Sequence, residues 1–582
     1  MSQSKIKDPS SKRSKPSLFS LLKPYRGMVS FLVIFALLSN GVNLVLPKII
    51  SRAIDAFAVG NFNLKTVVLE FLVAAFIIFF FTYLQSIVQT LASEKVARDL
   101  RTRLSDKISR QSYSYIQKTN PSKLLTNLTS DIDSIKMFVS MAVVTIFSSV
   151  FIIIGTCVLL LMINYKLAIP ILTIIPIIGG AFYLVIRKVK VLFKRSRENI
   201  DWLNKVINES IMGSAIIRVL NSQLSEYHKF LEANTNARDL GLSILRLFAT
   251  LIPIITFVAN LAMLTILMLG GHFVITGEMS LGDFAAFNSY LALLIFPIIM
   301  IGFMSNIMAQ ASASYGRINE VLEVPEPSET GTTKASLHGN IELRNISLSY
   351  DEKPVLKDIS LAIKGGTQVA IIGPTAAGKS QLLNLLTDLM KPDTGTILFD
   401  GIDIENYDKE SFRSQVGFVL QDSVIFNMSL RENIAFSDLV TDESLEKAIQ
   451  TSELKDFVDL LPDKLNTIVS ERGTSLSGGQ KQRIMLARAL ALDPKILLLD
   501  DFTSRVDRQT EKKILNNLAV NYPELTLVSI TQKIASVKHF EQIILLMEGE
   551  IIAQGTHNEL METCMEYVQI SNSQRSTSHY EL

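Results

Sequence analysis

The distribution of apolar and polar residues divides the chain into two parts of different character. Apolar runs of membrane-spanning length occupy residues 29 to about 308, whereas residues 340–570 mix apolar, polar and charged positions. A bilayer core requires about 20 mainly apolar residues in helical form. The segments that meet this requirement are residues 29–47, 66–90, 138–163, 167–186, 247–270 and 282–308. We therefore predict six membrane-spanning helices followed by a soluble domain.

The joins between the predicted spans differ in length and charge. Those after spans one, three and five are short, whereas the joins over residues 91–137 and 187–246 are long and rich in Lys and Arg. The long joins keep a helical periodicity, so we predict that they extend the helices beyond the bilayer. Basic residues beside spans tend to stay in the cytoplasm. This orientation places both termini and the soluble domain on the cytoplasmic side.

The same pattern sets the expected domain boundaries. The Pro- and Thr-bearing stretch after residue 322 has the composition of a linker. We expect a tail and short amphipathic segment over residues 1–27, a membrane domain over 28–322, a linker over 323–339, a soluble domain over 340–570 and a tail over 571–582.

The N-terminal segment, the net charge and the cysteine content argue against several classes of protein. The basic N-terminus has no apolar core or cleavage site of a secretory signal. A transit peptide is a second interpretation, but Lys dominates over Arg and Asp8 interrupts the segment. The net charge of +2 gives no reason to expect nucleic-acid binding, and Cys157 and Cys564 make neither a disulfide framework nor a metal site.

A Gly-rich segment in the soluble domain has the pattern of a phosphate-binding loop. It follows the apolar strand Val369–Ile372 and precedes a helical run. Its residues are Gly373, Pro374, Thr375, Ala376, Ala377, Gly378, Lys379 and Ser380, followed by Gln381. In such a loop, backbone N–H groups and the helix N-terminus bind phosphate oxygens. Lys379 is expected to reach the outer phosphates and Ser380 to bind magnesium, so we predict ATP and Mg²⁺ as ligands.

A second apolar strand, Ile496–Leu499, ends in Asp500 and Asp501. Asp500 is suited to hold Mg²⁺ through its water shell. The alternative is an ordinary strand terminus, which the spacing from Lys379 disfavours.

Further motifs follow one order along the soluble domain. They are Tyr350 before Pro354-Val355-Leu356, the phosphate loop, Gln421, Ser470–Gly473, Leu476-Ser477-Gly478-Gly479-Gln480, Asp500 and Ser504–Asp507. This series resembles the nucleotide-binding domain of an ABC exporter, and the six-span half, with Asn208-Glu209-Ser210 and Gly213, resembles the exporter membrane domain. The resemblance implies a six-helix transmembrane all-α domain followed by an α/β P-loop NTPase domain with a helical subdomain.

The resemblance also implies a two-chain sandwich. ATP would lie between the phosphate loop of one chain and Ser477, Gly478, Gly479 and Gln480 of the other. Tyr350 would stack on adenine, and Gln421 would contact Mg²⁺ and sense the γ-phosphate. The loop tips at residues 117–123 and 214–219 would couple closure of the sandwich to the membrane domain.

Two positions depart from the family pattern. The family has Glu where Asp501 stands, to polarise the attacking water, and His where Gln532 stands, to contact the γ-phosphate. The Asp carboxylate is drawn back by roughly 1.5 Å, and a misplacement near 1 Å costs on the order of a hundredfold in rate. Gln is neutral at physiological pH. We therefore predict impaired hydrolysis by the catalytic set Asp501, Gln532 and Gln421; neutral variation in a working site is the alternative.

Smaller departures are Ala376 for a usual Gly, Gln381 for a second hydroxyl, and Arg505 before Asp507. The signature Leu476–Gln480 is intact, so it can complete the ATP site of a second ABC half-transporter. The pattern resembles the degenerate half of bacterial heterodimeric multidrug-type exporters, which implies the bacterial inner membrane and an amphiphilic drug, lipid or peptide as substrate. A homodimeric exporter with slow ATPase activity, and an ATP-gated membrane regulator that does not pump, remain alternatives.

Overall fold

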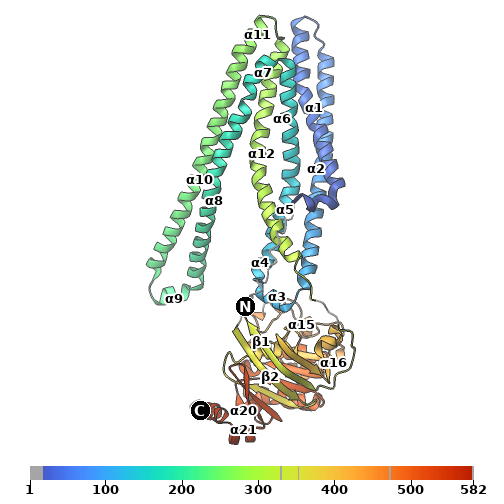
Figure 1. The fold of residues 1–582 in the computed structure, drawn as a ribbon, viewed down its shortest axis with the longest axis vertical. Helices are drawn as coiled ribbons and strands as arrows, with labels where there is room; N and C mark the ends of the chain where they lie inside the picture. The colour runs from blue at the N-terminus through green and yellow to red at the C-terminus, as the bar shows by residue number, and fades with distance from the viewer. Residues whose placement is uncertain (1–17, 328–330, 351–352, 471–472, 580–582) are drawn as a thin grey trace, which may run out of the picture. The chain divides into compact units, whose positions relative to one another are not determined.

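The computed structural model describes residues 18–327, 331–350, 353–470 and 473–579. The predicted tail before residue 18, Glu471 and Arg472 of the motif series, and the last three residues lie outside this part of the chain. The chain divides into two compact units (Figure 1). One comprises Met1–Arg110 and Thr119–Pro325; the other comprises Gln111–Lys118 and Glu326–Leu582.

The first unit contains long apolar helical segments. Those of membrane-spanning length among the described residues are Ser20–Ala58, Leu64–Ser109, Pro121–Ile163, Tyr165–Met212, Gln223–Ile275 and Leu281–Leu322. They confirm the six predicted spans, and the chain is a multi-pass membrane protein.

The helices of this unit extend beyond the predicted spans. The elements are η1 (Leu18–Tyr25), α1 (Arg26–Ala58), α2 (Leu64–Ser109), α4 (Pro121–Thr126), α5 (Ile132–Met137), α6 (Val143–Ile163), α7 (Tyr165–Leu172), α8 (Ile174–Met212), α9 (Ser214–Val219), α10 (Gln223–Thr265), α11 (Gly271–Ile275) and α12 (Leu281–Leu322). Helices α8 and α10 lie side by side and are joined through α9 (Figure 1). The helical extensions predicted for the long joins are therefore confirmed.

Polar contacts fix the N-terminal end of α12 against α1. The Asp55 carboxylate accepts hydrogen bonds from the Ser280 hydroxyl and the Gly282 N–H, both at 2.7 Å. A Cβ on Gly282 would lie 2.0 Å from the Ser51 carbonyl oxygen, so only glycine permits this approach. The Lys48 ammonium donates to the Asp283 carboxylate at 2.9 Å.

The second unit is built on two sheets. Strands β1 (Ile341–Tyr350), β2 (Lys353–Ile363), β4 (Thr394–Phe399) and β5 (Ile402–Asp403) form an antiparallel sheet in the order β2-β1-β4-β5. Strands β3 (Gln368–Ile372), β6 (Val416–Val419), β7 (Ile496–Asp500), β8 (Thr526–Ile530), β9 (Gln542–Met547) and β10 (Glu550–Gly555) form the other, in the order β10-β9-β3-β8-β7-β6. All pairings in the second sheet are parallel except that of β10 with β9.

The second unit also contains helices that follow its strands along the chain. They are α13 (Lys379–Leu386), α14 (Lys409–Arg413), α15 (Leu430–Ile434), α16 (Asp442–Thr451), α17 (Lys455–Asp459), α18 (Gly478–Leu490), α19 (Arg508–Asn521), α20 (Ile534–Val537), α21 (His557–Thr563) and α22 (Met565–His579). Helices α15 to α17 stand between β6 and α18 in the chain, where a helical subdomain is expected. The predicted fold class is confirmed.

The central strands β7 and β8 are buried at every position. A parallel sheet with both faces covered requires such continuous apolar runs, and its strands all point the same way. Ile530 of β8 pairs with Ile371 of β3 and with Asp500 of β7. The carboxyl ends of these strands therefore meet at one edge of the sheet.

Candidate nucleotide site

The candidate site residues follow the carboxyl ends of four neighbouring parallel strands. The phosphate loop follows β3, Gln421 follows β6, Asp501 follows β7 and Gln532 follows β8. Open α/β sheets bind ligands at this edge. The structure thus brings together residues that lie far apart in the sequence.

The loop after β3 is shaped by left-handed backbone. Gly373 has φ +155° and Gly378 has φ +99°, and a Cβ on Gly373 would lie 1.9 Å from the Leu546 carbonyl oxygen. Ala376 also has a positive φ, of 66°. For a residue other than glycine this conformation costs roughly 1–2 kcal/mol. Glycine would avoid this strain, and glycine is the residue that the resemblance to ABC exporters implies at this position.

Lys379, at the start of α13, is held inside the loop. Its Nζ donates to the carbonyls of Gly373 at 2.9 Å and Pro374 at 2.7 Å. Burial lowers the pKa of this ammonium, and the charges of Asp500 and Asp501 oppose that shift. Neutral carbonyls bind the cation in this structure, so its charge is available to a phosphate, which fits ATP.

Asp500 supplies oxygen ligands at the end of β7. Its side chain is buried, and burial together with the neighbouring Asp501 charge raises its pKa, while a hydrogen bond from Ser380 and the Lys379 charge lower it. Mg²⁺ prefers a carboxylate and a hydroxyl beside phosphate oxygens. Asp500 and Ser380 are the residues that would hold this ion.

Asp501 turns the chain away from β7 in left-handed backbone, with φ 47° and ψ 38°. Its N–H donates to the Ile530 carbonyl at 3.0 Å, and its own carbonyl accepts from the Ser504 hydroxyl at 2.9 Å. Burial raises the pKa of its carboxyl group, and Lys533 and Lys379 lower it. The backbone is thus fixed at both ends, leaving the short side chain to reach the site.

Gln532 is exposed, and its loop is held by a residue that sequence reasoning missed. The Gln574 amide of α22 donates to the Gln532 carbonyl at 2.5 Å and accepts from the Ile534 N–H at 3.0 Å. Gln574 lies in the segment that was expected to be a C-terminal tail. A lone polar residue 42 positions away carries no local signal of this contact.

The signature residues form the N-terminus of α18. The Ser477 hydroxyl accepts from the Gln480 N–H at 3.3 Å, and the Gln480 side chain accepts from the Ser477 N–H at 2.8 Å. This capping box fixes the helix start. A Cβ on Gly479 would lie 2.9 Å from the Arg505 carbonyl oxygen, so the signature packs directly on the segment after Asp501. Gln482, another residue missed by sequence reasoning, accepts from the Arg505 N–H at 3.2 Å.

Tyr350, the predicted adenine-stacking residue, ends β1 and contacts the first long join. Its hydroxyl donates to the Gln117 side-chain oxygen at 3.2 Å. Gln117 lies in α3 (Tyr113–Lys118), and residues Gln111–Lys118 belong to the same compact unit as the two sheets. The predicted coupling tip 117–123 is therefore divided, because residues from Thr119 onward belong to the membrane unit.

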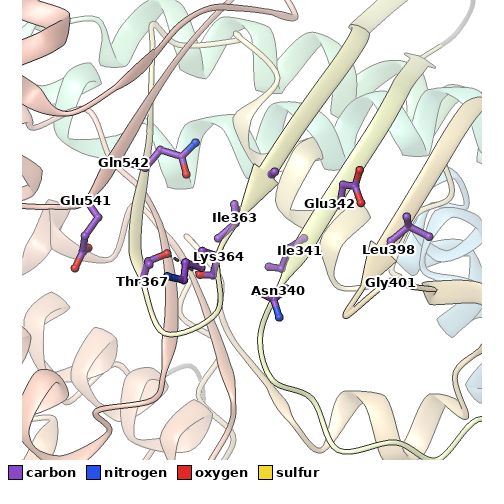
Figure 2. Close-up of a pocket in the computed structure, with 11 residues that line it drawn as sticks. Asn340, Ile341, Glu342, Ile363, Lys364, Thr367, Leu398, Gly401, Glu541 and Gln542 are labelled. Carbon is purple, nitrogen blue, oxygen red and sulfur yellow. Dashed lines mark hydrogen bonds between the residues drawn. The ribbon is translucent and has the colours of Figure 1, made fainter.

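A separate cavity of about 520 Å³ lies at the other edge of the sheets (Figure 2). It is lined by Asn340, Glu342 and Lys364, and by Thr367 and Gln542, which stand at the amino ends of β3 and β9. The phosphate loop lies at the opposite, carboxyl ends of these parallel strands. This cavity is therefore distinct from the candidate nucleotide site.

Comparison with known proteins agrees with this geometry. Residues 29–298 match the ABC transporter transmembrane region, and residues 356–504 match the ABC transporter family model. The uncharacterized ABC transporter ATP-binding protein YfiB of Bacillus subtilis is 32% identical over 95% of this chain and 98% of its own length. The chain belongs to the ABC transporter family, as a half-transporter of the exporter type with fused membrane and ATP-binding domains.

Other relatives share nearly the full length. The ATP-dependent lipid A-core flippase of Syntrophus aciditrophicus is 29% identical over 96% of this chain and 94% of its own. The fatty acid ABC transporter ATP-binding/permease protein of Mycobacterium tuberculosis is 30% identical over 93% of this chain and 84% of its own length. A bacterial Atm1-family ABC exporter with ATP bound has the same fold, with a TM-score of 0.79, 24% identity and coverage of 94% of this chain and 98% of that one.

Proposed function

We propose that this chain is one half of a heterodimeric exporter in a bacterial inner membrane, with both termini in the cytoplasm, and that its own ATP site is hydrolytically impaired. The observation that carries the proposal is the pairing of Asp501 and Gln532 at one sheet edge with an intact signature at Ser477–Gln480. The residues expected to hydrolyse ATP at this chain's own site are altered, whereas the signature that would complete a partner's site is not.

The exported substrate is an amphiphilic or hydrophobic drug, lipid or peptide. Two relatives are named for lipid A-core and fatty acid, and a third, from Bacillus subtilis, for probable multidrug resistance. Amphiphilic and hydrophobic compounds of these kinds partition into membranes. This property suits a transport domain whose six helical segments expose many apolar side chains.

At this chain's own site, the residues are suited to bind ATP better than to hydrolyse it. Lys379 and the N–H groups of the loop bind phosphate, while Ser380 and Asp500 hold Mg²⁺, which neutralises charge on the phosphates. Tyr350 holds the adenine. Asp501 has a backbone fixed by Ile530 and Ser504, so its carboxylate cannot advance to the position that a longer Glu side chain reaches.

At the second site, Ser477–Gln480 completes the phosphate loop of the partner chain. The capping box leaves the N–H groups of Gly478 and Gly479 at a helix N-terminus, where an anion is stabilised. Hydrolysis there drives the transport cycle, and Gln421 and the loop tips at residues 117–123 and 214–219 transmit closure to the membrane domain.

The test is the composition and activity of the native complex. The tagged chain is extracted gently from its own membrane, and the mass of the intact assembly is measured. We expect a one-to-one complex with a second ABC half-transporter that carries Glu and His at the two altered positions. A pure homodimer would contradict the proposal; substrate-stimulated ATP turnover would then separate a slow exporter from an ATP-gated regulator.

A further inference from the structure

A groove runs between α8 and α10 on the surface of the membrane unit. It has a volume of about 720 Å³, and its lining includes Arg187, Lys188 and Val191 of α8 and Arg246 and Leu247 of α10. Leu184 completes the wall on the α8 side. Both helices contribute a cation and an apolar side chain, so the groove combines positive charge with apolar surface.

The charge of this α8–α10 groove is not balanced locally. No Asp or Glu occurs from residue 166 to 197 or from 240 to 277. Arg187, Lys188 and Arg246 are all exposed, and within the described part of the chain none of the three makes an ion pair with a carboxylate. Three positive charges therefore face one groove without an acidic partner.

The position of these cations along the helices corresponds to the membrane surface. Arg187 directly follows the fourth predicted span, and Arg246 directly precedes the fifth. The helix from Tyr165 to Arg187 is roughly 33 Å long at about 1.5 Å per residue, and the hydrocarbon core of a bilayer is about 30 Å thick. In the orientation predicted from the basic joins, the three cations lie at the depth of the lipid headgroups of the cytoplasmic leaflet.

The apolar wall continues toward the bilayer. Leu184 is 61% exposed and precedes Arg187 by about one helical turn on the membrane side. Leu247 stands at the same end of the fifth span. A small soluble anion would leave these apolar side chains exposed, whereas the glycerol and first acyl carbons of a lipid would bury them.

We propose that the α8–α10 groove binds an anionic phospholipid of the cytoplasmic leaflet. The lipid phosphate lies between Arg187 and Arg246, whose planar guanidinium groups suit bidentate phosphate binding, and Lys188 adds a point charge. The acyl chains extend along Leu184 and Leu247. Basic pockets between membrane helices on the cytoplasmic side are typical of such lipid sites. This site requires neither the heterodimer nor the impaired ATP site.

The experiment titrates the purified full-length complex in detergent with phosphatidylglycerol or phosphatidylcholine and counts bound lipids by native mass spectrometry. The groove variant is R187Q/K188Q/R246Q. The matched control K190Q/K194Q/R195Q removes the same charge from α8, at positions outside the groove lining. We expect the groove variant to lose phosphatidylglycerol affinity by roughly tenfold to a hundredfold, since each basic residue near the surface contributes about fivefold. The control variant and phosphatidylcholine binding should be unchanged.

Three outcomes would overturn the proposal. They are equal binding of both lipids by the unmodified complex, equal loss in the groove and control variants, and complete displacement of phosphatidylglycerol by inorganic phosphate, which would indicate a free-anion site. If the triple variant cannot be purified, Arg246→Gln alone should weaken phosphatidylglycerol binding and Arg246→Lys should restore part of it. Identical binding by both single variants and the unmodified complex would also contradict the site.

Discussion

The phosphate-loop side of the ATP-binding unit and its signature side differ in how far they depart from the family pattern. On the first side, Asp501 and Gln532 replace the expected residues, and Ala376 holds a conformation that favours glycine. On the second, the capping box of Ser477 and Gln480 is complete. This contrast is the basis of the proposed function, in which ATP binding and support of a partner are retained and hydrolysis at this chain's own site is impaired.

The largest expected effect comes from disrupting the signature. Gly479→Val places a branched side chain where even a Cβ lies 2.9 Å from the Arg505 carbonyl oxygen. We expect ATP turnover of the complex to fall by about a hundredfold or more, because misplacement of about 1 Å has this cost. Asp501→Asn is the matched variant at the other site, and it should leave turnover of the complex nearly unchanged. Equal losses in both variants would remove the contrast between the two sides.

Restoring the altered positions should produce a smaller effect in the opposite direction. Asp501→Glu combined with Gln532→His should raise ATP turnover at this chain's own site by roughly tenfold to a hundredfold, as expected for a carboxylate advanced by about 1 Å. The measurement requires a complex in which the partner's phosphate-loop lysine is replaced, so that only this site is counted. Each single substitution serves as a control. No gain from the double variant would show that the two replacements are not what limits hydrolysis.

The buried carboxylate of Asp500 predicts a pH-dependent stability. Its pKa is raised by burial above the ordinary value of 3.8, so the folded state binds more protons than the unfolded state. Stability without nucleotide therefore falls as the pH rises through the raised pKa. Asp500→Asn should increase the melting temperature near neutral pH, and the gain should shrink as the pH falls toward 3.8. Thermal unfolding at several pH values measures this; a gain independent of pH would contradict the assigned cause.

The smallest expected effect concerns the loop that contains Gln532. Gln574→Leu removes two hydrogen bonds to backbone groups, at 2.5 and 3.0 Å, and should destabilise the loop by about 1–3 kcal/mol. Hydrogen exchange at the Ile534 amide should become faster, while exchange in β7 should not change. The neighbouring exposed substitution Asn572→Leu is the control. Unchanged exchange at Ile534 would show that α22 does not hold this loop.

Sequence patterns predicted the spans and the order of motifs because those signals are local. Apolar runs and a strand–loop–helix segment need only neighbouring residues. The contact of Tyr350 with Gln117 joins positions 233 residues apart, and the groove cations come from two antiparallel helices. The sequence also carried no direct signal of the positive φ of Ala376, although this residue was recognised as a departure from the family pattern. Such features arise only when the chain is folded.

The division of the first long join has a practical consequence for building chimeras. Residues Gln111–Lys118 are grouped with the ATP-binding unit, although they lie more than 200 positions before its sheets. A graft that exchanges only the part after Pro325 would place a foreign β1 aromatic against the native Gln117. An ATP-binding domain transplanted between relatives should therefore carry its own version of residues 111–118 with it.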